Sequence, residues 1–295
     1  MSASVPSLPP LEHHDIDVGE VRLHVVTAGP EGGMPVLLLH GFPEFWWGWA
    51  HQLGPLVDAG YRVVVPDQRG YNTSDKAPRT KDYGLQHLVG DVIGLLDALD
   101  LDRPVLVCHD WGGAVGWQAI LTHPERFRGF VPMNMPHIGV MNKELRRLRQ
   151  LKKSWYIFAF QLPGVAEKLL TANDYQKLVG ALFTNTVHRS FTDDDLDRYR
   201  EAWSQPGAVT GMVRWYRAIA RYGSPKPPHR TVEVPSRMIW GKQDKALGFP
   251  MVEPSAAYLT NGDLHVIEDA GHFVQHDRPD RVNELLLDFL ASLER

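Results

Sequence analysis

The sequence predicts an α/β fold: a mostly parallel sheet flanked by helices and interrupted by an all-helical insertion. Short continuous runs of Val and Leu alternate with helical patterns in the first half of the chain and again near its end, which is typical of buried parallel strands. Residues 138–222 differ, because they are rich in aromatic side chains and contain no convincing strand pattern. We therefore expect a core of residues 1–136 and 226–295 and a helical cap of residues 137–225.

The expected core elements follow one another in alternation, with Gly and Pro between them. The predicted strands are Val21–Val26, Val36–Leu39, Arg62–Val65, Val105–Cys108, a strand near Val131, Arg237–Trp240 and Leu264–Ile267. The predicted core helices are Leu85–Leu99, Gly113–Leu121, Glu253–Leu259 and a final helix with an apolar face of Val282, Leu285, Leu286, Phe289 and Leu290. Helical patterns in the cap are Lys143–Lys153, Val165–Leu182 and Asp193–Trp203.

Composition and charge exclude several classes of function. The 295 residues carry a net charge of −4 and no long basic run, so nucleic acid is not an expected partner. A single cysteine, Cys108, excludes an internal disulfide and a multi-cysteine metal site. The first ten residues do not resemble a secretory signal, and no run approaches the ~18 apolar residues of a membrane span. We therefore expect a cytoplasmic protein that acts on a small molecule.

The most informative segment leads from a predicted strand into a helix through Asp110. The apolar run Val105–Cys108 is followed by His109, Asp110 and then two glycines at 112 and 113, a pattern that predicts a sharp strand–turn–helix elbow. An ionised carboxylate at the apex is already nucleophilic, and a helix amino terminus favours an anion. The alternative is that Asp110 only caps the helix. A phosphate loop is disfavoured, because neither GxGxxG nor GxxxxGK[ST] is present.

An ester formed on Asp110 has to be hydrolysed, which requires a base that activates water. His272 follows the predicted strand Leu264–Ile267 and precedes the last helix, so it is expected on a loop at the end of a strand, where sites form in parallel sheets. His276, four residues further on, raises the alternative of a metal site. That alternative is disfavoured, because the two histidines lack a helical pattern between them and an HExxH motif.

The base needs a carboxylate that orients its ring and a partner site for the oxyanion. Asp244 follows the predicted strand Arg237–Trp240, whereas the alternative position for this acid, after the strand near Val131, carries Asn134. The turn after Val36–Leu39 contains Gly41 and Pro43, and we expect it to aim the Phe42 N–H at the oxyanion. The Trp111 N–H would supply the second donor. The alternative for Gly41 and Pro43 is a plain turn.

From about Val18 onward, the chain resembles the α/β-hydrolase fold and, within it, the soluble epoxide hydrolases. The order of nucleophile, acid and histidine along the chain agrees with this fold. Five segments carry the resemblance: HGFPE at His40–Glu44, DQRGYNTSD at Asp67–Asp75, HDWGG at His109–Gly113, GKQD at Gly241–Asp244 and GHF at Gly271–Phe273.

The resemblance implies a reaction in two stages without a cofactor or a metal. Asp110 opens an epoxide while two cap tyrosines bind its oxygen, and these correspond to Tyr156 and Tyr216. Water activated by His272, with Asp244 behind it, then releases a vicinal diol. The alternative is that both tyrosines are packing residues of the cap. Aromatic side chains around Trp46 and from Trp155 to Phe160 indicate an apolar substrate, and Trp46, Trp155 and Phe160 are the candidate pocket residues.

A dehalogenase is the main alternative, because it uses the same aspartate nucleophile. Its halide would need N–H donors, for which Trp111 and either Trp46 or Trp47 are candidates. Fluoroacetate dehalogenases place arginines directly after the nucleophile, where this chain has Trp111 and Ala114. A non-catalytic binding protein on this fold is disfavoured, because nucleophile, acid, base and both tyrosines are all present. A serine esterase is disfavoured, because the apex residue is Asp110.

Overall fold

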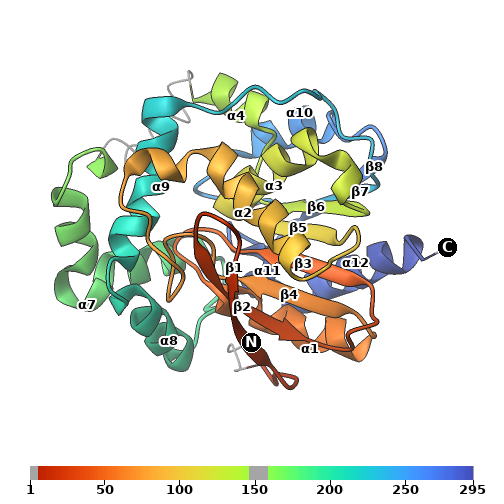
Figure 1. Cartoon of the computed structure of the whole chain (residues 1–295), viewed down its shortest axis with the longest axis horizontal. Helices are drawn as coiled ribbons and strands as arrows, with labels where there is room; N and C mark the ends of the chain where they lie inside the picture. Colours follow the sequence, from red (N-terminus) through yellow and green to blue (C-terminus); the bar gives the residue numbers. More distant parts are fainter. Residues whose placement is uncertain (1–5, 146–158, 295) are drawn as a thin grey trace.

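The computed structural model describes residues 6–145 and 159–294 (Figure 1). These residues contain an eight-stranded sheet. The strand order is β1-β2-β4-β3-β5-β6-β7-β8. An antiparallel hairpin of β1 (Glu12–Asp17) and β2 (Arg22–Ala28) stands at one edge, and β2 also pairs antiparallel with β4. The other strands run parallel: β3 (Pro35–Leu39), β4 (Arg62–Pro66), β5 (Val105–His109), β6 (Gly129–Met133), β7 (Ser236–Gly241) and β8 (Gly262–Ile267). The predicted fold class is confirmed.

Helices cover both faces of this sheet, which explains why its central strands are uninterrupted apolar runs. On one face, α2 (Leu85–Ala98) packs against α3 (Asp110–Thr122), and on the other α1 (Ala50–Asp58) packs against α12 (Pro279–Ser292). Two short helices, α10 (Val252–Ala256) and α11 (Val274–Asp277), complete the core. Neither β1 nor α1 was predicted, because β1 is a polar edge strand and α1 contains Pro55.

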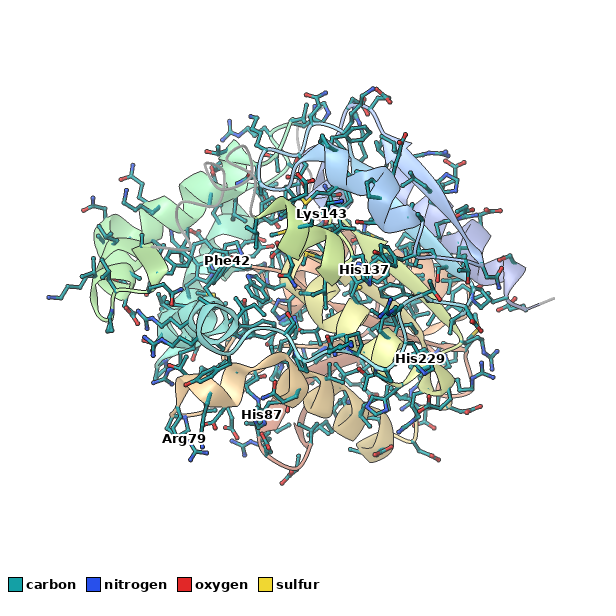
Figure 2. The ribbon with its side chains drawn as sticks, turned by 90° about the horizontal axis from the view of Figure 1, so that it is seen from above. Phe42, Arg79, His87, His137, Lys143 and His229 are labelled. Atoms are coloured by element: carbon teal, nitrogen blue, oxygen red, sulfur yellow. The ribbon has the colours of Figure 1, made fainter. Side chains whose placement is uncertain are left out.

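Between β6 and β7, the described residues form helices and no strand. These helices are α4 (Ile138–Glu144), α7 (Val165–Thr184), α8 (Asp193–Ser204) and α9 (Ala208–Tyr222). Helix α7 leaves helical geometry at residues 172–175, and most of the predicted helix Lys143–Lys153 lies outside the described residues. Seen from above (Figure 2), Phe42 lies at the boundary between the inserted helices and the core. Among the described residues, no helix is long and apolar enough to cross a bilayer.

Candidate active site

The elbow predicted at Asp110 is present between β5 and α3. Asp110 has a φ of +48°, in the left-handed region that aspartate tolerates better than most residues. Two close approaches require the glycines that follow: a Cβ on Gly112 would lie 2.3 Å from the Leu39 carbonyl oxygen, and one on Gly113 would lie 2.5 Å from the Met135 Cβ. The Asp110 carboxylate contacts residues of other loops, which favours a chemical role over a helix cap.

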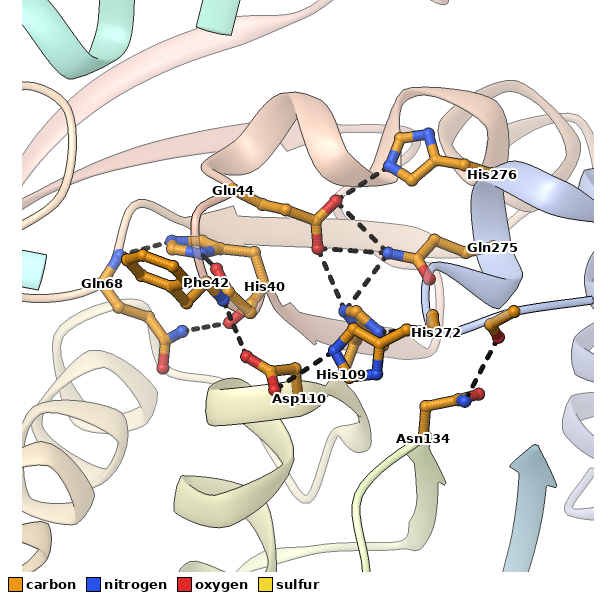
Figure 3. Close-up of polar contacts among 12 residues, drawn as sticks. His40, Phe42, Glu44, Gln68, His109, Asp110, Asn134, His272, Gln275 and His276 are labelled. Carbon is orange, nitrogen blue, oxygen red and sulfur yellow. Dashed lines mark hydrogen bonds and ion pairs between the residues drawn. The ribbon is translucent and has the colours of Figure 1, made fainter. Parts of the chain in front are cut away.

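Three strand ends bring Asp110, His272 and Asp244 together, and Figure 3 shows the contact between Asp110 and His272. His272 Nε2 lies 3.3 Å from Asp110 Oδ2, and His272 Nδ1 lies 2.9 Å from Asp244 Oδ2. The other Asp244 oxygen accepts hydrogen bonds of 2.8 Å from the backbone N–H groups of Ala246 and Leu247. The acid is therefore fixed on both oxygens, and it holds the imidazole with its second nitrogen toward Asp110.

Asn134, at the end of β6, holds the acid in place. Its Nδ2 donates to Asp244 Oδ2 over 2.7 Å, and its Oδ1 accepts from the Gly241 N–H over 2.9 Å. Sequence reasoning considered this position only as an alternative site for the carboxylate. In the structure Asn134 has a different role, because its amide donates a hydrogen bond to Asp244. A second carboxylate at this position would repel Asp244.

Charge within this site favours an ion pair in the resting protein. Burial alone would lower the pKa of His272, but the carboxylates of Asp244 and Asp110 raise it to about 10. Burial would likewise raise the pKa of Asp110, but the hydrogen bond and charge of His272 hold it below its ordinary value. At neutral pH, Asp110 is therefore an anion and His272 a cation. Removing the charge of Asp110 would lower the pKa of His272 and favour its neutral form, which can act as a base.

Replacing Asp110 with asparagine is expected to lower the pKa of His272, because one of the two anions that stabilise the imidazolium is lost. Titration of the histidine ring nitrogens by NMR measures this shift. The matched control is Asp97→Asn, which removes a surface carboxylate paired with Arg126. An unchanged pKa in Asp110→Asn would show that the two groups are not coupled.

Glu44 forms a second buried cluster near His272 (Figure 3). His109 Nδ1 and His276 Nε2 lie 3.0 and 2.8 Å from its carboxylate oxygens, and the Tyr199 hydroxyl donates to it over 3.2 Å. Burial alone would raise the pKa of Glu44, but the hydrogen bonds from His109 and His276 hold it well below its usual range. His109 Nε2 also lies 2.8 Å from the His272 carbonyl oxygen, so the cluster supports the loop that carries His272. Sequence reasoning did not identify Glu44.

The loop that carries His272 is also tied to the inserted segment. The His272 N–H donates to the Asn185 carbonyl, just after α7, over 2.8 Å. The Asp277 carboxylate accepts from the Gly271 N–H over 2.7 Å and from the Val187 N–H over 3.0 Å. One buried carboxylate therefore joins the loop of the base to the chain between α7 and α8.

The two N–H groups predicted for the oxyanion lie next to Asp110. The Phe42 N–H donates to Asp110 Oδ1 over 2.9 Å, and Trp111 is in the first turn of α3, where N–H groups have no partner within a helix. The ring of Tyr216, from α9, packs edge-on against both residues, with centroid distances of 5.2 Å to Phe42 and 4.9 Å to Trp111. Phe160 packs against Tyr216 at 5.0 Å.

A cavity of about 90 Å³ opens at Asp110 and is lined by Tyr216 and Trp111 as well. Most other described lining residues are apolar: Leu85, Ala114, Met135, Ile138, Met141, Leu145, Ile219 and Leu247. Asp110 is the one charged side chain among the described lining residues. Trp46 instead lines a separate cavity together with His13 and His24. Trp155 and Tyr156 lie outside the described residues.

Comparison with known proteins agrees with this geometry. Residues 34–279 match the family described as alpha/beta hydrolase fold. The AB hydrolase superfamily protein YfhM of Bacillus subtilis is 44% identical, over 94% of this chain and 97% of that protein. Epoxide hydrolase 4 of Mus musculus is 36% identical, over 93% of this chain and 78% of its own. The crystal structure of a Bacillus megaterium epoxide hydrolase in complex with an inhibitor superimposes with a TM-score of 0.85 at 29% identity, covering 95% of this chain and 100% of the other. The chain therefore belongs to the α/β-hydrolase fold family, among its epoxide hydrolase-like proteins.

Proposed function

We propose that this protein is an epoxide hydrolase that converts an apolar epoxide into a vicinal diol through an ester on Asp110. The observation that carries the proposal is that one small apolar cavity is lined by an ionised carboxylate, Asp110, and a phenol, Tyr216. A carboxylate attacks saturated carbon, and a phenol donates to the oxygen that leaves that carbon. The relatives and solved structures named above as epoxide hydrolases support the same reaction.

In the first stage, Asp110 attacks an epoxide carbon, the carbon–oxygen bond breaks, and the oxygen takes up a proton. Tyr216, and Tyr156 as predicted from the sequence, would hydrogen-bond this oxygen as its negative charge develops. The product is a hydroxyalkyl ester of Asp110. The phenol would supply the proton that this oxygen takes up and would be reprotonated from solvent. Ester formation also removes the anion that helped to raise the pKa of His272, so the histidine can lose its own proton to solvent and become neutral.

In the second stage, neutral His272 takes a proton from water, and the resulting hydroxide attacks the carbonyl carbon of the ester. The N–H groups of Phe42 and Trp111 would stabilise the tetrahedral oxyanion. Asp244 keeps the imidazole oriented throughout. Collapse of the intermediate releases the diol and restores the Asp110 carboxylate.

A substrate panel with product identification tests the proposed reaction. It contains aryl and alkyl epoxides, haloalkanes and fluoroacetate. We expect a diol from the epoxides and no halide release from the halogenated compounds. Halide release without diol formation would contradict the proposal and favour a dehalogenase, which uses the same nucleophile.

Tyr216→Phe is expected to slow ester formation by about 10²-fold, because the transition state loses its phenol donor. Ester hydrolysis should keep its rate, because the Tyr216 phenol takes no part in that step. Rapid-quench mass spectrometry of the adduct separates the two rates. Tyr222→Phe is the matched control, since Tyr222 lies on the same helix with 57% of its surface exposed. If neither Tyr216→Phe nor Tyr156→Phe slows ester formation, the tyrosines are packing residues and the dehalogenase gains support.

We also propose a role for the inserted segment, a class of substrate and a location for the protein. Residues 137–225 would act as one cap over the cavity, with Tyr156 and Trp155 contributing to it. A small apolar substrate would be the principal partner, in keeping with the apolar lining. A cytoplasmic location stays a prediction from the single cysteine.

A further inference from the structure

We infer that Gly70, Gly211 and Trp215 are positioning residues that set the distance between Tyr216 and Asp110. This inference rests on the proposed function, because it concerns the phenol used in ring opening. The three residues join helix α9 to the loop after β4, which lie side by side in Figure 1. None of them lines the cavity next to Asp110.

The contact between the two glycines leaves no room for a side chain. A Cβ on Gly211 would lie 2.3 Å from the Gly70 carbonyl oxygen and 2.7 Å from the Gly70 Cα. A Cβ on Gly70 would lie 3.1 Å from the Gly211 backbone, and Gly70 has a φ of +92°, which disfavours other residues. Helix α9 therefore rests directly on the backbone of the loop.

One turn further along α9, a hydrogen bond fixes the same close contact between the helix and the loop. The indole N–H of Trp215 donates to the Arg69 carbonyl over 2.9 Å. Gly211 and Trp215 are four residues apart, so they lie on the same face of the helix. Tyr216 is the next residue, about 100° around the axis, and its ring packs against Trp111. The contact between α9 and the loop after β4 therefore determines the position of the Tyr216 phenol on the adjacent face of the helix.

Hydrogen bonds hold the loop after β4 in place, so the loop cannot easily move away from α9. The buried Arg69 guanidinium donates to both oxygens of Asp91, over 2.8 and 2.5 Å, and to Glu20 over 3.0 Å. It also donates to the Asp82 carbonyl over 2.7 Å. The Gly70 N–H donates to the Asp75 carbonyl over 2.9 Å, which closes the loop on itself. A side chain added at the contact would therefore displace α9 rather than the loop.

The two reaction stages depend differently on this displacement. A methyl group on Gly211 would need α9 to move by about 1 Å to reach an ordinary contact distance. Such a misplacement of a reacting group can cost about 10²-fold in rate. Ring opening needs the Tyr216 phenol, which moves with α9. Hydrolysis of the ester needs His272 and Asp244, whose hydrogen bonds to each other, to Asn134 and to the Asn185 carbonyl after α7 do not involve α9.

The test follows formation and decay of the ester on Asp110 in single turnovers of the full chain with an epoxide. Gly211→Ala should slow ester formation by about 10²-fold and leave ester decay unchanged. Trp215→Phe, which keeps a ring but loses the N–H, should slow the same step by about 10-fold, as expected for one lost hydrogen bond. Gly180→Ala is the matched control, because a Cβ at that exposed position in α7 meets nothing within 4 Å. It should leave both steps unchanged.

Two outcomes overturn the inference. Equal loss in both steps would show general damage to the fold, and wild-type rates of ester formation in Gly211→Ala and Trp215→Phe would show that the contact does not position Tyr216. If Gly211→Ala does not fold, Trp215→Phe decides alone. The wild-type protein is measured first: if it forms neither ester nor diol, the proposed function fails, which is distinct from a failure of the positioning role.

Discussion

Replacing Asp110 with alanine is expected to abolish turnover, with a fall in kcat of about 10⁴-fold or more. In the proposed reaction this carboxylate attacks the epoxide, and no described lining residue of the cavity offers a second one. Initial rates of diol release measure the loss. Circular dichroism and thermal unfolding show whether the fold is retained.

The backbone at Asp110 requires a second variant as a control. Its φ of +48° costs alanine about 1 kcal/mol, whereas asparagine tolerates this region nearly as well as aspartate. Asp110→Asn should therefore be inactive in diol release while its unfolding temperature stays closer to that of the wild type. Diol formation at the wild-type rate in either variant would remove Asp110 from the mechanism.

Replacing His272 with glutamine is expected to stop the reaction after its first stage. Asp110 is already ionised and needs no base for its attack, but the ester it forms does need one, because neutral water is a poor nucleophile. The variant should accumulate a covalent adduct of one substrate mass. Intact-protein mass spectrometry detects the adduct, and peptide mapping should locate it on the peptide that contains Asp110.

His229→Gln is the matched control for this variant, because Figure 2 shows His229 well away from Phe42 and the site. It should form diol like the wild type. A single turnover of the wild type in ¹⁸O-labelled water should place the label first in Asp110 and an unlabelled oxygen in the first diol. Label in the first diol, together with no adduct in His272→Gln, would indicate direct attack by water.

The proximity of Asp110, Asp244 and His272 was predictable because all three residues follow strands. Continuous Val and Leu runs identify parallel strands, and the ends of such strands converge at one edge of a sheet. Asp110 and Asp244 come just after β5 and β7, and His272 lies on the loop that follows β8, so their proximity, with contacts of 3.3 and 2.9 Å, needed no long-range information. Local spacing along the chain was sufficient.

Other parts of the site depend on packing between distant segments. Glu44 meets His276 across 232 residues of chain, and Gly70 meets Gly211 through backbone contact alone. Neither contact leaves a pattern in the local sequence. The positions of the aromatic side chains could not be predicted either, because composition does not indicate which side of a loop a ring faces. Trp46 thus lines a separate cavity, while Phe160 packs against Tyr216.

The hydrogen bonds of Asp277 and Asn185 bear on how enzymes of this fold are recombined. Exchanging the inserted helices between relatives is an attractive way to change substrate range, with junctions placed near residues 137 and 225. In this chain, such a chimera would also exchange the segment that accepts the His272 N–H and donates to Asp277. A functional chimera must therefore have a compatible backbone conformation at residues 185–190. Otherwise the exchanged segment will alter the position of His272, although His272 itself is not exchanged.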